Sequence, residues 1–409
     1  MRQFDVAVAG AGLGGLAAAA LLSTMGKKAI LCTSSPSLDD ALGAVSKDGF
    51  LFCPGPSLSY GFEPGGPFHQ LLADLGLEEI APALAPNFQV ALPDRRITVT
   101  ANQEETLEEL SREFPREIDN IARFYRDLTK EAERNAKSRI AAYFSRRRSA
   151  SGFLRKYAFS DELQSFFNIQ ALFFFQRPVS GLSLATLIAL CTTRPFHYCG
   201  GRGKLADRLL GIILQREGVV RYKEAAQEIV LQSHRAIGIK TAQGMVEAGT
   251  VLLDSQEQRV PLLFLGIRDE VVPIGMARDV LYLPDYNQPN DFIALSLSAN
   301  DDLASAPSGM RTLTAAFHPT EQPSAQSQMI GSISRLVPFL NEFLVLTDGP
   351  RPAESVPAST GISFKPVRSE GGGQLLFRAS KGNIYKLDEA RHAPLQQISS
   401  VRKFIQQVT

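Results

Sequence analysis

Residues 6–22 read VAVAGAGLGGLAAAALL, which is a short apolar run, a glycine-rich turn and an alanine-rich run. Gly10, Gly12 and Gly15 have the spacing G-x-G-x-x-G between a predicted strand at Asp5–Ala9 and a predicted helix. In this motif the first glycine permits a tight turn, the second lets a pyrophosphate approach the backbone, and the third lets the helix pack on the strand. The N-terminus of the helix then offers its free N–H groups to the phosphate charge.

A second predicted strand at Lys28–Cys32 follows Gly26 and completes a β-α-β unit. The alternative is a membrane segment, because the 17 residues are apolar. They contain four glycines, however, and lie at the lower limit of the roughly 17–25 residues that a spanning helix needs. Since no small-residue cleavage pattern follows, a signal peptide is not expected either. The stretch therefore predicts a Rossmann-type α/β fold.

The composition argues against several classes of function. The chain has 409 residues, which at roughly 150 residues per domain suggests two or three domains. Its 43 basic and 42 acidic residues nearly cancel, so we expect no nucleic-acid partner. The four cysteines form neither a C-x-x-C pair nor a zinc-ligand spacing, and the five histidines are scattered. We expect a cytoplasmic protein with reduced cysteines and no metal site.

The order of the expected elements suggests two lobes, each built from separate parts of the chain. A helix is expected at 67–75 with Gly76 as its stop, strands at 88–92 and 97–100, and helices through 103–143 with a break at Pro115. A β-meander is expected after the helix in 197–218, and a further helix near 324–343. We predict a discontinuous dinucleotide-binding lobe (1–66, 191–259 and 356–409) and a mixed α+β substrate-binding lobe (67–190 and 260–355).

Four stretches carry a resemblance to a known family. They are FDVAVAGAGLGGLAAAALLSTMGKKAILC, SKDGFLFCPGPSLSYG, the region from FHYCGGRGKLADRLL to IKTAQG, and GNIYKLDEARHAPLQQISS near the end. In this order they resemble the phytoene desaturase and carotenoid isomerase branch of the flavin amine oxidase superfamily. The resemblance covers most of the chain.

This resemblance implies an FAD-dependent oxidoreductase that acts on a lipophilic substrate such as an isoprenoid, a polyene or an amine. The redox chemistry would belong to the flavin, so no catalytic side chain is identified. The residues that it implies for cofactor binding are Gly10, Gly12, Leu13, Gly14, Gly15, Thr33, Ser34, Gly43, Ala226 and Asp388.

Several positions depart from the family's pattern. Thr33 or Ser34 stands where the family has a glutamate for the adenosine ribose, and no arginine accompanies Gly43. Leu387, Gln396 and Gln397 replace glycines of the second flavin motif, and Cys53 replaces an aspartate. Each lost charged or bidentate contact costs about 1.5–3 kcal/mol, so we expect weak FAD binding or none. The alternative function is a flavin-free lipid- or protein-binding escort, for which the Rab GDP-dissociation inhibitors are the precedent.

Two further segments allow two interpretations each. Residues 137–156 hold seven basic residues and no acid, which fits either a docking patch for an anionic membrane or a solvated helix end. The stretch LQSFFNIQALFFFQRP holds five phenylalanines, which fit either the wall of an apolar tunnel or a core helix. We favour the solvated end and the core helix.

Overall fold

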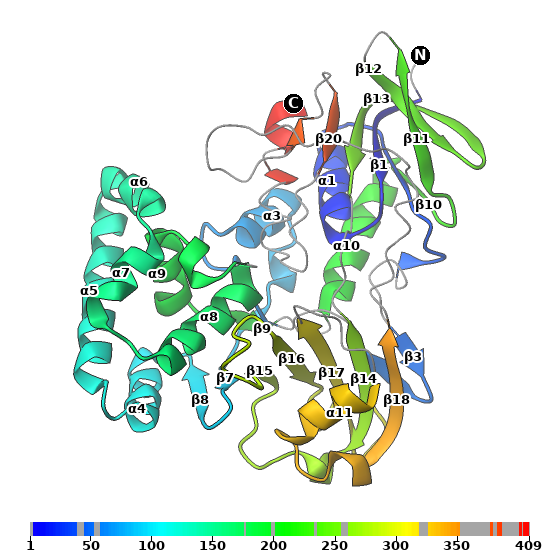
Figure 1. Ribbon diagram of the computed structural model, residues 1–409. Coiled ribbons are helices and arrows are strands. Elements are labelled where there is room, and N and C mark those ends of the chain that lie inside the picture. The colour runs from blue at the N-terminus through cyan, green and yellow to red at the C-terminus, as the bar shows by residue number, and fades with distance from the viewer. Residues whose placement is uncertain are drawn as a thin grey trace.

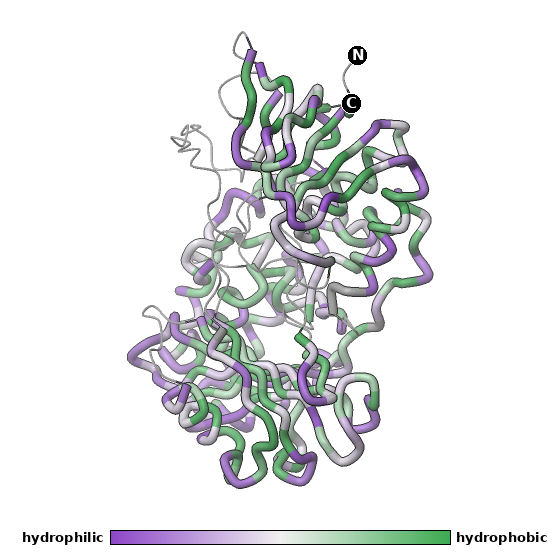
Figure 2. Tube along the Cα trace, turned by 90° about the vertical axis from the view of Figure 1, so that its right-hand side faces the viewer, coloured by the Kyte–Doolittle hydropathy of each residue, from purple (hydrophilic) through white to green (hydrophobic). Residues whose placement is uncertain are grey.

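The computed structural model describes residues 3–38, 45–52, 58–175, 177–197, 201–232, 235–254, 261–318, 326–351, 377–378, 383–386, 401–402 and 404–408. The described chain forms two large sheets and a layer of helices beside the second sheet (Figure 1). Hydrophobic segments, green in Figure 2, gather inside both halves, whereas the outer turns are hydrophilic. Each half therefore has its own core, as a chain of this length requires.

The first sheet contains the expected β-α-β unit. Strands β1 (Phe4–Ala9) and β2 (Ala29–Cys32) pair in parallel, and α1 (Leu13–Thr24) connects them. Eleven of the twelve residues of α1 are buried, since the helix lies between the sheet and α10 (Gly201–Gln215). A helix that is apolar all round belongs in an interior. The structure confirms the Rossmann-type fold that the glycine turn predicts.

The expected meander extends this sheet. The strand order is β10-β2-β1-β13-β12-β11, and β20 (Ile384–Lys386) lies beside β13. The first half of β13 pairs antiparallel with β12, and its second half pairs in parallel with β1. One strand thus joins the meander to the Rossmann unit. The bounds of the others are β10 Val219–Arg221, β11 Ala226–Gln232, β12 Arg235–Thr241 and β13 Gly244–Leu253.

Asn383 fixes the C-terminal part of the chain to this sheet. Its buried side-chain amide donates to the carbonyls of Ala236 (2.7 Å) and Gly249 (2.6 Å) and accepts from the N–H of Ala236 (2.9 Å). Residues 401–402 and 404–408 are helical, and Phe404 packs edge-on against Tyr385. Sequence-distant segments therefore meet around α1.

The second sheet has the order β18-β14-β17-β16-β15-β7-β8 and is antiparallel except for the pair β7–β15. Its strands are β7 Asn87–Ala91, β8 Arg96–Thr100, β14 Leu262–Arg268, β15 Asp279–Tyr282, β16 Phe292–Leu297, β17 Met310–His318 and β18 Leu344–Arg351. The single helix expected near 324–343 was wrong. Instead, α11 (Gln326–Ser334) ends early and a short 3-10 turn follows at Leu340–Glu342. Pro338 cannot donate to a helix, and Phe339 has a left-handed φ of 63°.

Along the chain between β8 and α10 most residues are helical, and these helices lie at the left of Figure 1. They are α4 Gln103–Glu113, α5 Ile118–Lys137, α6 Arg139–Arg147, α7 Ala150–Leu154, α8 Asp161–Phe175 and α9 Leu184–Thr192. The gap between α4 and α5 contains Pro115, as expected. Phe124 is fully buried at the centre of this layer, with five aromatic rings within about 6 Å.

Two elements near the predicted lobe boundary pack against different sheets. The helix α3 (Pro67–Leu75) ends at Gly76, in the left-handed conformation expected for a stop, and shares a hydrophobic cluster with α1. The hairpin β3 (Val45–Lys47) and β4 (Phe50–Phe52) instead reaches the second sheet, where the ring of Phe52 lies 5.2 Å from that of Phe264. The lobe boundaries stay a prediction.

Candidate cofactor site at the glycine turn

The glycine turn lies at the carboxyl edge of β1 and β2, where Rossmann-type folds bind dinucleotides. Gly10 has φ +122°, a conformation that L side chains rarely adopt, and its N–H donates to the carbonyl of Cys32 at 2.9 Å. The helix α1 then begins at Leu13 with Gly12 as its N-cap. Because glycine has no side chain, Gly12 cannot cap the helix itself, and the first N–H groups need another acceptor.

The carboxylate of Asp254 supplies this acceptor. Its Oδ2 accepts hydrogen bonds from the N–H groups of Gly12 at 2.8 Å and Gly15 at 3.1 Å. Asp254 directly follows β13, and its own N–H donates to the carbonyl of Ala9 at 2.9 Å. Only 6% of the residue is exposed. A residue 242 positions along the chain thus caps the helix that a phosphate is expected to meet.

This close approach also explains two of the glycines. A Cβ at Gly10 would lie 2.5 Å from the carbonyl oxygen of Asp254, and a Cβ at Gly15 would lie 2.6 Å from its Oδ2. Both distances are too short for real atoms, so a side chain at either position would displace the strand end from the helix. Gly15 therefore lets the helix pack closely, as the sequence predicts, and the partner is the end of β13.

Burial changes the charge behaviour of Asp254. Desolvation raises the pKa of its carboxyl group from 3.8 to about 6, although the hydrogen bonds from Gly15 and Gly12 lower it. The positive end of the helix dipole favours the ionised form in the same way. At neutral pH a negative charge thus lies beneath the glycine turn, where it weakens the attraction of the helix end for a phosphate.

Two buried N–H groups at the start of α1 lie beside the two that Asp254 binds. The N–H groups of Leu13 and Gly14 have no hydrogen-bond acceptor among the described residues. They belong to the first turn of α1, and the N–H groups of a first turn have no acceptor within their own helix. The structure thus brings Gly10, Gly12, Leu13, Gly14 and Gly15 together around a helix end where two N–H groups have no acceptor among the described residues. This part of the site fits one phosphate of a dinucleotide.

The end of β2, where the adenosine ribose is expected, is occupied by local contacts. Thr33 is buried, and its Oγ1 accepts from the N–H of Ser35 at 3.2 Å. The carbonyl of Thr33 accepts from the N–H of Glu224 at 2.8 Å, whereas Ser34 is exposed. Of the two candidate hydroxyls, Ser34 is therefore the more accessible to a ligand.

Glu224 is a carboxylate at this edge that sequence reasoning missed. It is 1% exposed, and its Oε1 accepts from the hydroxyl of Thr241 at 2.5 Å and pairs with Arg221 at 3.1 Å. Ala226, the first residue of β11, is buried opposite Thr241. Because Glu224 is buried and already paired, it supports the edge of the sheet and does not replace the missing ribose-binding glutamate.

Other candidate positions fall outside the described residues. These are Gly43, Asp388, Cys53, Leu387, Gln396 and Gln397. The roles predicted for them and for the described site residues stay predictions. Among the described residues, no group of three or more His, Cys, Asp or Glu side chains could hold a metal ion.

A buried histidine and aspartate meet where β9 (Phe196–His197) lies near the second sheet. The Nε2 of His197 is 3.4 Å from Oδ2 of Asp279 in β15, and both side chains are less than 10% exposed. The two residues are 82 positions apart, so no local spacing in the sequence could reveal the pair. This contact ties the chain before α10 to β15, an inner strand of the second sheet.

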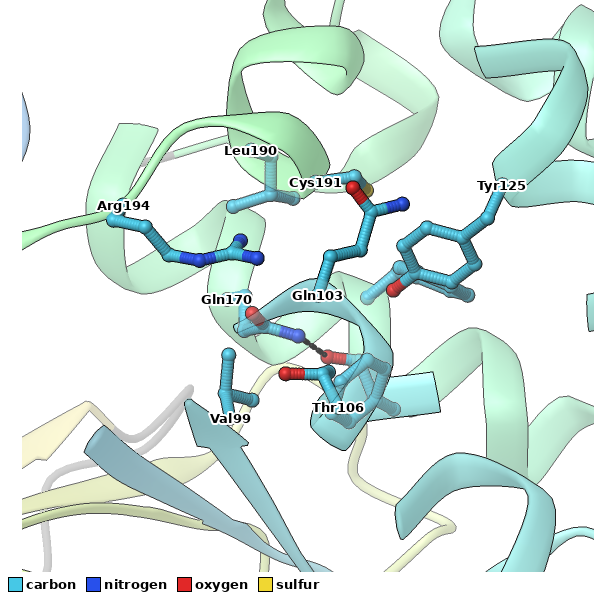
Figure 3. Close-up of a pocket in the computed structure, with 10 residues that line it drawn as sticks. Val99, Gln103, Thr106, Tyr125, Gln170, Leu190, Cys191 and Arg194 are labelled. Carbon is cyan, nitrogen blue, oxygen red and sulfur yellow. Dashed lines mark hydrogen bonds between the residues drawn. The ribbon is translucent and has the colours of Figure 1, made fainter. Parts of the chain in front are cut away.

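The phenylalanine-rich helix α8 belongs to the core. Phe166 and Phe167 are each 1% exposed and Phe174 is 6% exposed. The pocket beside the helix is lined by Gln170, Tyr125 and Arg194 among others (Figure 3). Its volume of about 10 Å³ is at the lower limit for a single water molecule. This pocket therefore does not hold a polyene, and the core interpretation of α8 agrees with the structure.

None of the described helices is both long and apolar enough to cross a membrane. The basic segment 137–156 covers α6, α7 and the turn after them, and it places three large apolar side chains in solvent.

Sequence comparison gives distant relatives. No protein-family profile matches the chain. The prolycopene isomerase of the chloroplast of Daucus carota is 25% identical over 276 residues, which is 59% of this chain and 44% of that protein. The match thus spans less than half the length of this relative. It confirms the resemblance to the carotenoid isomerase branch of the flavin amine oxidase superfamily.

Solved structures share the fold over nearly the whole chain. An oxidoreductase from Methanosarcina mazei has a TM-score of 0.63 at 14% identity and covers 98% of this chain and 100% of its own. A putrescine oxidase triple mutant, made to redesign cofactor binding, has 0.61 at 12% with 99% and 98% covered. The Rab GDI from Plasmodium falciparum has 0.61 at 12% with 98% of both chains covered. At such identities the likeness establishes the fold alone.

Proposed function

We propose that the protein is an FAD-dependent oxidoreductase of the phytoene desaturase or amine oxidase type, with a weakened cofactor site. The observation that carries this proposal is the glycine turn at the end of β1, where two N–H groups at the start of α1 have no acceptor in the part of the chain that the structure describes. The similarity to prolycopene isomerases and the shared fold with a putrescine oxidase support it.

The residues that would hold the cofactor are those of the turn. The N–H groups of Leu13 and Gly14 would donate to one phosphate of FAD, and Gly12 would leave room for the approach. Ser34 would lie at the adenosine end. When bound, FAD would supply the redox chemistry, because such cofactors carry the reactive centre and the protein supplies position and electrostatics.

The substrate class is part of the proposal. The prolycopene isomerase relative is named for a carotenoid, so we propose a lipophilic substrate of the isoprenoid or polyene class, with an amine as the alternative. The small pocket beside α8 is not its site. The substrate would instead have to reach a flavin held at the glycine turn.

A flavin-free lipid- or protein-binding role is the alternative function. Asp254 is the specific observation for it, since a buried carboxylate beneath the turn opposes a diphosphate. The same fold occurs in a Rab GDI. The relatives named for isomerase or oxidase activity favour the enzyme.

Titration of the purified protein with FAD tests the proposal. Binding is followed by the change in flavin absorbance and by the shift in melting temperature. Saturable binding that Gly12→Val abolishes supports a cofactor at the turn. Absence of binding at FAD concentrations up to millimolar contradicts the proposal and leaves the flavin-free alternative.

A further inference from the structure

The outward side of α6 carries three large apolar side chains in solvent. Ile140 is 71% exposed, Tyr143 is 49% exposed and Phe144 is 56% exposed. Their spacing of three and four positions places them on one face of the helix. We call these three residues the α6 face. The other exposed large apolar residues of the described chain are isolated from one another in the sequence. Single exposed apolar residues are ordinary, whereas a contiguous group marks an interaction site.

The fold does not need this face for its own packing. The opposite side of α6 is held by small residues against α5 and α9, and the buried Ser145 donates to Oδ1 of Asn135 at 2.8 Å. The hydroxyl of Ser138 caps the helix by accepting from the N–H of Ala141 at 3.3 Å. In Figure 1, α6 lies at the outer end of the helical layer, away from the first sheet. The α6 face therefore points into solvent from a fixed support.

Cations surround the α6 face. Residues 137–156 contain Lys137, Arg139, Arg146, Arg147, Arg148, Arg155 and Lys156 and no acid. Arg139 and Arg146 are seven positions apart, which is two helical turns, so they lie on the same flank. The guanidinium of Arg147 lies 4.6 Å from the centre of the Tyr143 ring, within the apolar face itself. The rings of Tyr143 and Phe144 are thus exposed beside the long cationic side chain of Arg147.

Two acids of α5 that lie near the start and end of this segment have partners of their own. Glu131 of α5 forms ion pairs with Arg148 at 3.1 Å and Arg134 at 2.6 Å. Asp127 of α5 accepts from the hydroxyl of Tyr157 at 2.9 Å. Arg139, Arg146 and Arg147 have no carboxylate partner among the described residues. The flank therefore has an excess of positive charge that is available to a partner.

We propose that the α6 face is a docking site for an anionic phospholipid surface. A membrane surface offers negative headgroups above an apolar interior, which matches cations around exposed Ile, Tyr and Phe side chains. Aromatic rings with a polar tip favour this boundary. The attraction between basic residues and anionic lipids falls as salt is added. This proposal does not depend on flavin binding.

The chain contains no tryptophan, which provides a sensitive test. Tyr143→Trp places one indole on the α6 face, where the side chain is half exposed. The emission is recorded with vesicles of phosphatidylcholine alone and with vesicles that also contain phosphatidylserine, at low and high salt. We expect a blue shift with the anionic vesicles at low salt. No shift, or equal shifts with both kinds of vesicle, would overturn the proposal.

Vesicle flotation of the full chain tests the named residues. Phe144→Ser should lower binding to anionic vesicles about tenfold or more, because the apolar ring can no longer be buried among the lipid chains. The double variant Arg139→Gln, Arg146→Gln should lower it further and remove most of its salt dependence. Ile274→Ser is the matched control, since Ile274 is fully exposed elsewhere. Equal vesicle binding by wild type and Phe144→Ser would overturn the proposal. The proposal would also be overturned if wild type self-associates through this face, Phe144→Ser does not, and neither protein binds vesicles.

Discussion

The side chain of Asp254 caps the helix that begins after Gly12. Its Oδ2 accepts the N–H of Gly12 at 2.8 Å and that of Gly15 at 3.1 Å, at the point where Rossmann-type folds receive a phosphate. The same contact stabilises α1 and places a carboxylate beside the cofactor's expected diphosphate. Stability of the fold and affinity for the cofactor therefore make opposite demands on this residue.

Asp254→Asn should tighten FAD binding at neutral pH. Asparagine keeps an oxygen acceptor for the two N–H groups but removes the charge, and two unit charges about 8 Å apart interact by roughly 2 kcal/mol at an effective dielectric of ~20. We expect the Kd for FAD to fall about tenfold or more in a fluorescence-quenching titration. Asp254→Ala, which also removes the cap, is the control and should lower the melting temperature. A weaker affinity of Asp254→Asn would show that the carboxylate does not oppose the cofactor.

The pH dependence of stability should change in the same variant. Because burial raises the pKa of Asp254 from 3.8 to about 6, the native state binds a proton in this range more readily than the unfolded state. The contribution of this group to the free energy of unfolding is therefore full below about pH 4 and falls as the pH rises towards about 6. Urea unfolding across this range should show a decline in wild type that is reduced in Asp254→Asn. Identical profiles would contradict the assignment.

Gly12→Val and Gly10→Val should separate binding from folding. Gly12 has φ −72° and ψ 172°, which valine adopts readily, so this variant should fold and lose nucleotide binding. Gly10 has φ +122°, and a Cβ there would lie 2.5 Å from the carbonyl oxygen of Asp254, so Gly10→Val should fail to fold stably. Circular dichroism and FAD titration of both variants test this. A folded Gly12→Val protein with wild-type affinity would refute the placement of the phosphate.

Asn383→Ala should destabilise the first sheet. The side chain makes three hydrogen bonds to buried backbone groups of Ala236 and Gly249, and buried polar groups left unsatisfied cost about 1–3 kcal/mol each. We expect a loss of about 2–5 kcal/mol in the free energy of unfolding, measured by urea denaturation. Asn383→Asp keeps the acceptor but loses both N–H donors, so this variant should be destabilised as well. The exposed Asn287→Ala is the control. A loss of stability in Asn383→Ala that is no larger than in Asn287→Ala would contradict the role of Asn383.

Local patterns predicted the first sheet well. The glycine turn, the strands around α1 and the meander that ends in β13 follow directly from spacing and apolar alternation. The helix expected near 324–343 was wrong because Pro338 and the left-handed Phe339 end helical geometry locally. The strands β14, β15 and β18 depend on partners far along the chain, and such pairing is not encoded in a local period.

The site could be predicted only in part, because some of its contacts join residues that lie far apart in the sequence. The glycines that form the turn are adjacent in sequence, so their spacing reveals them. Asp254 lies 242 positions after Gly12, and only the folded chain brings its carboxylate to the turn. An acidic residue directly after a strand that runs parallel to β1 is the signal that could have revealed it. Glu224 and the pair His197–Asp279 are likewise contacts of the folded chain alone.

The most direct test of the central claim is the visible absorption spectrum of the purified protein during titration with FAD, for wild type and Asp254→Asn side by side. We predict saturable binding in both proteins, with the flavin bands perturbed and the affinity higher for Asp254→Asn. Neither protein binding FAD, although both are folded, would contradict a cofactor at the glycine turn and leave the flavin-free role.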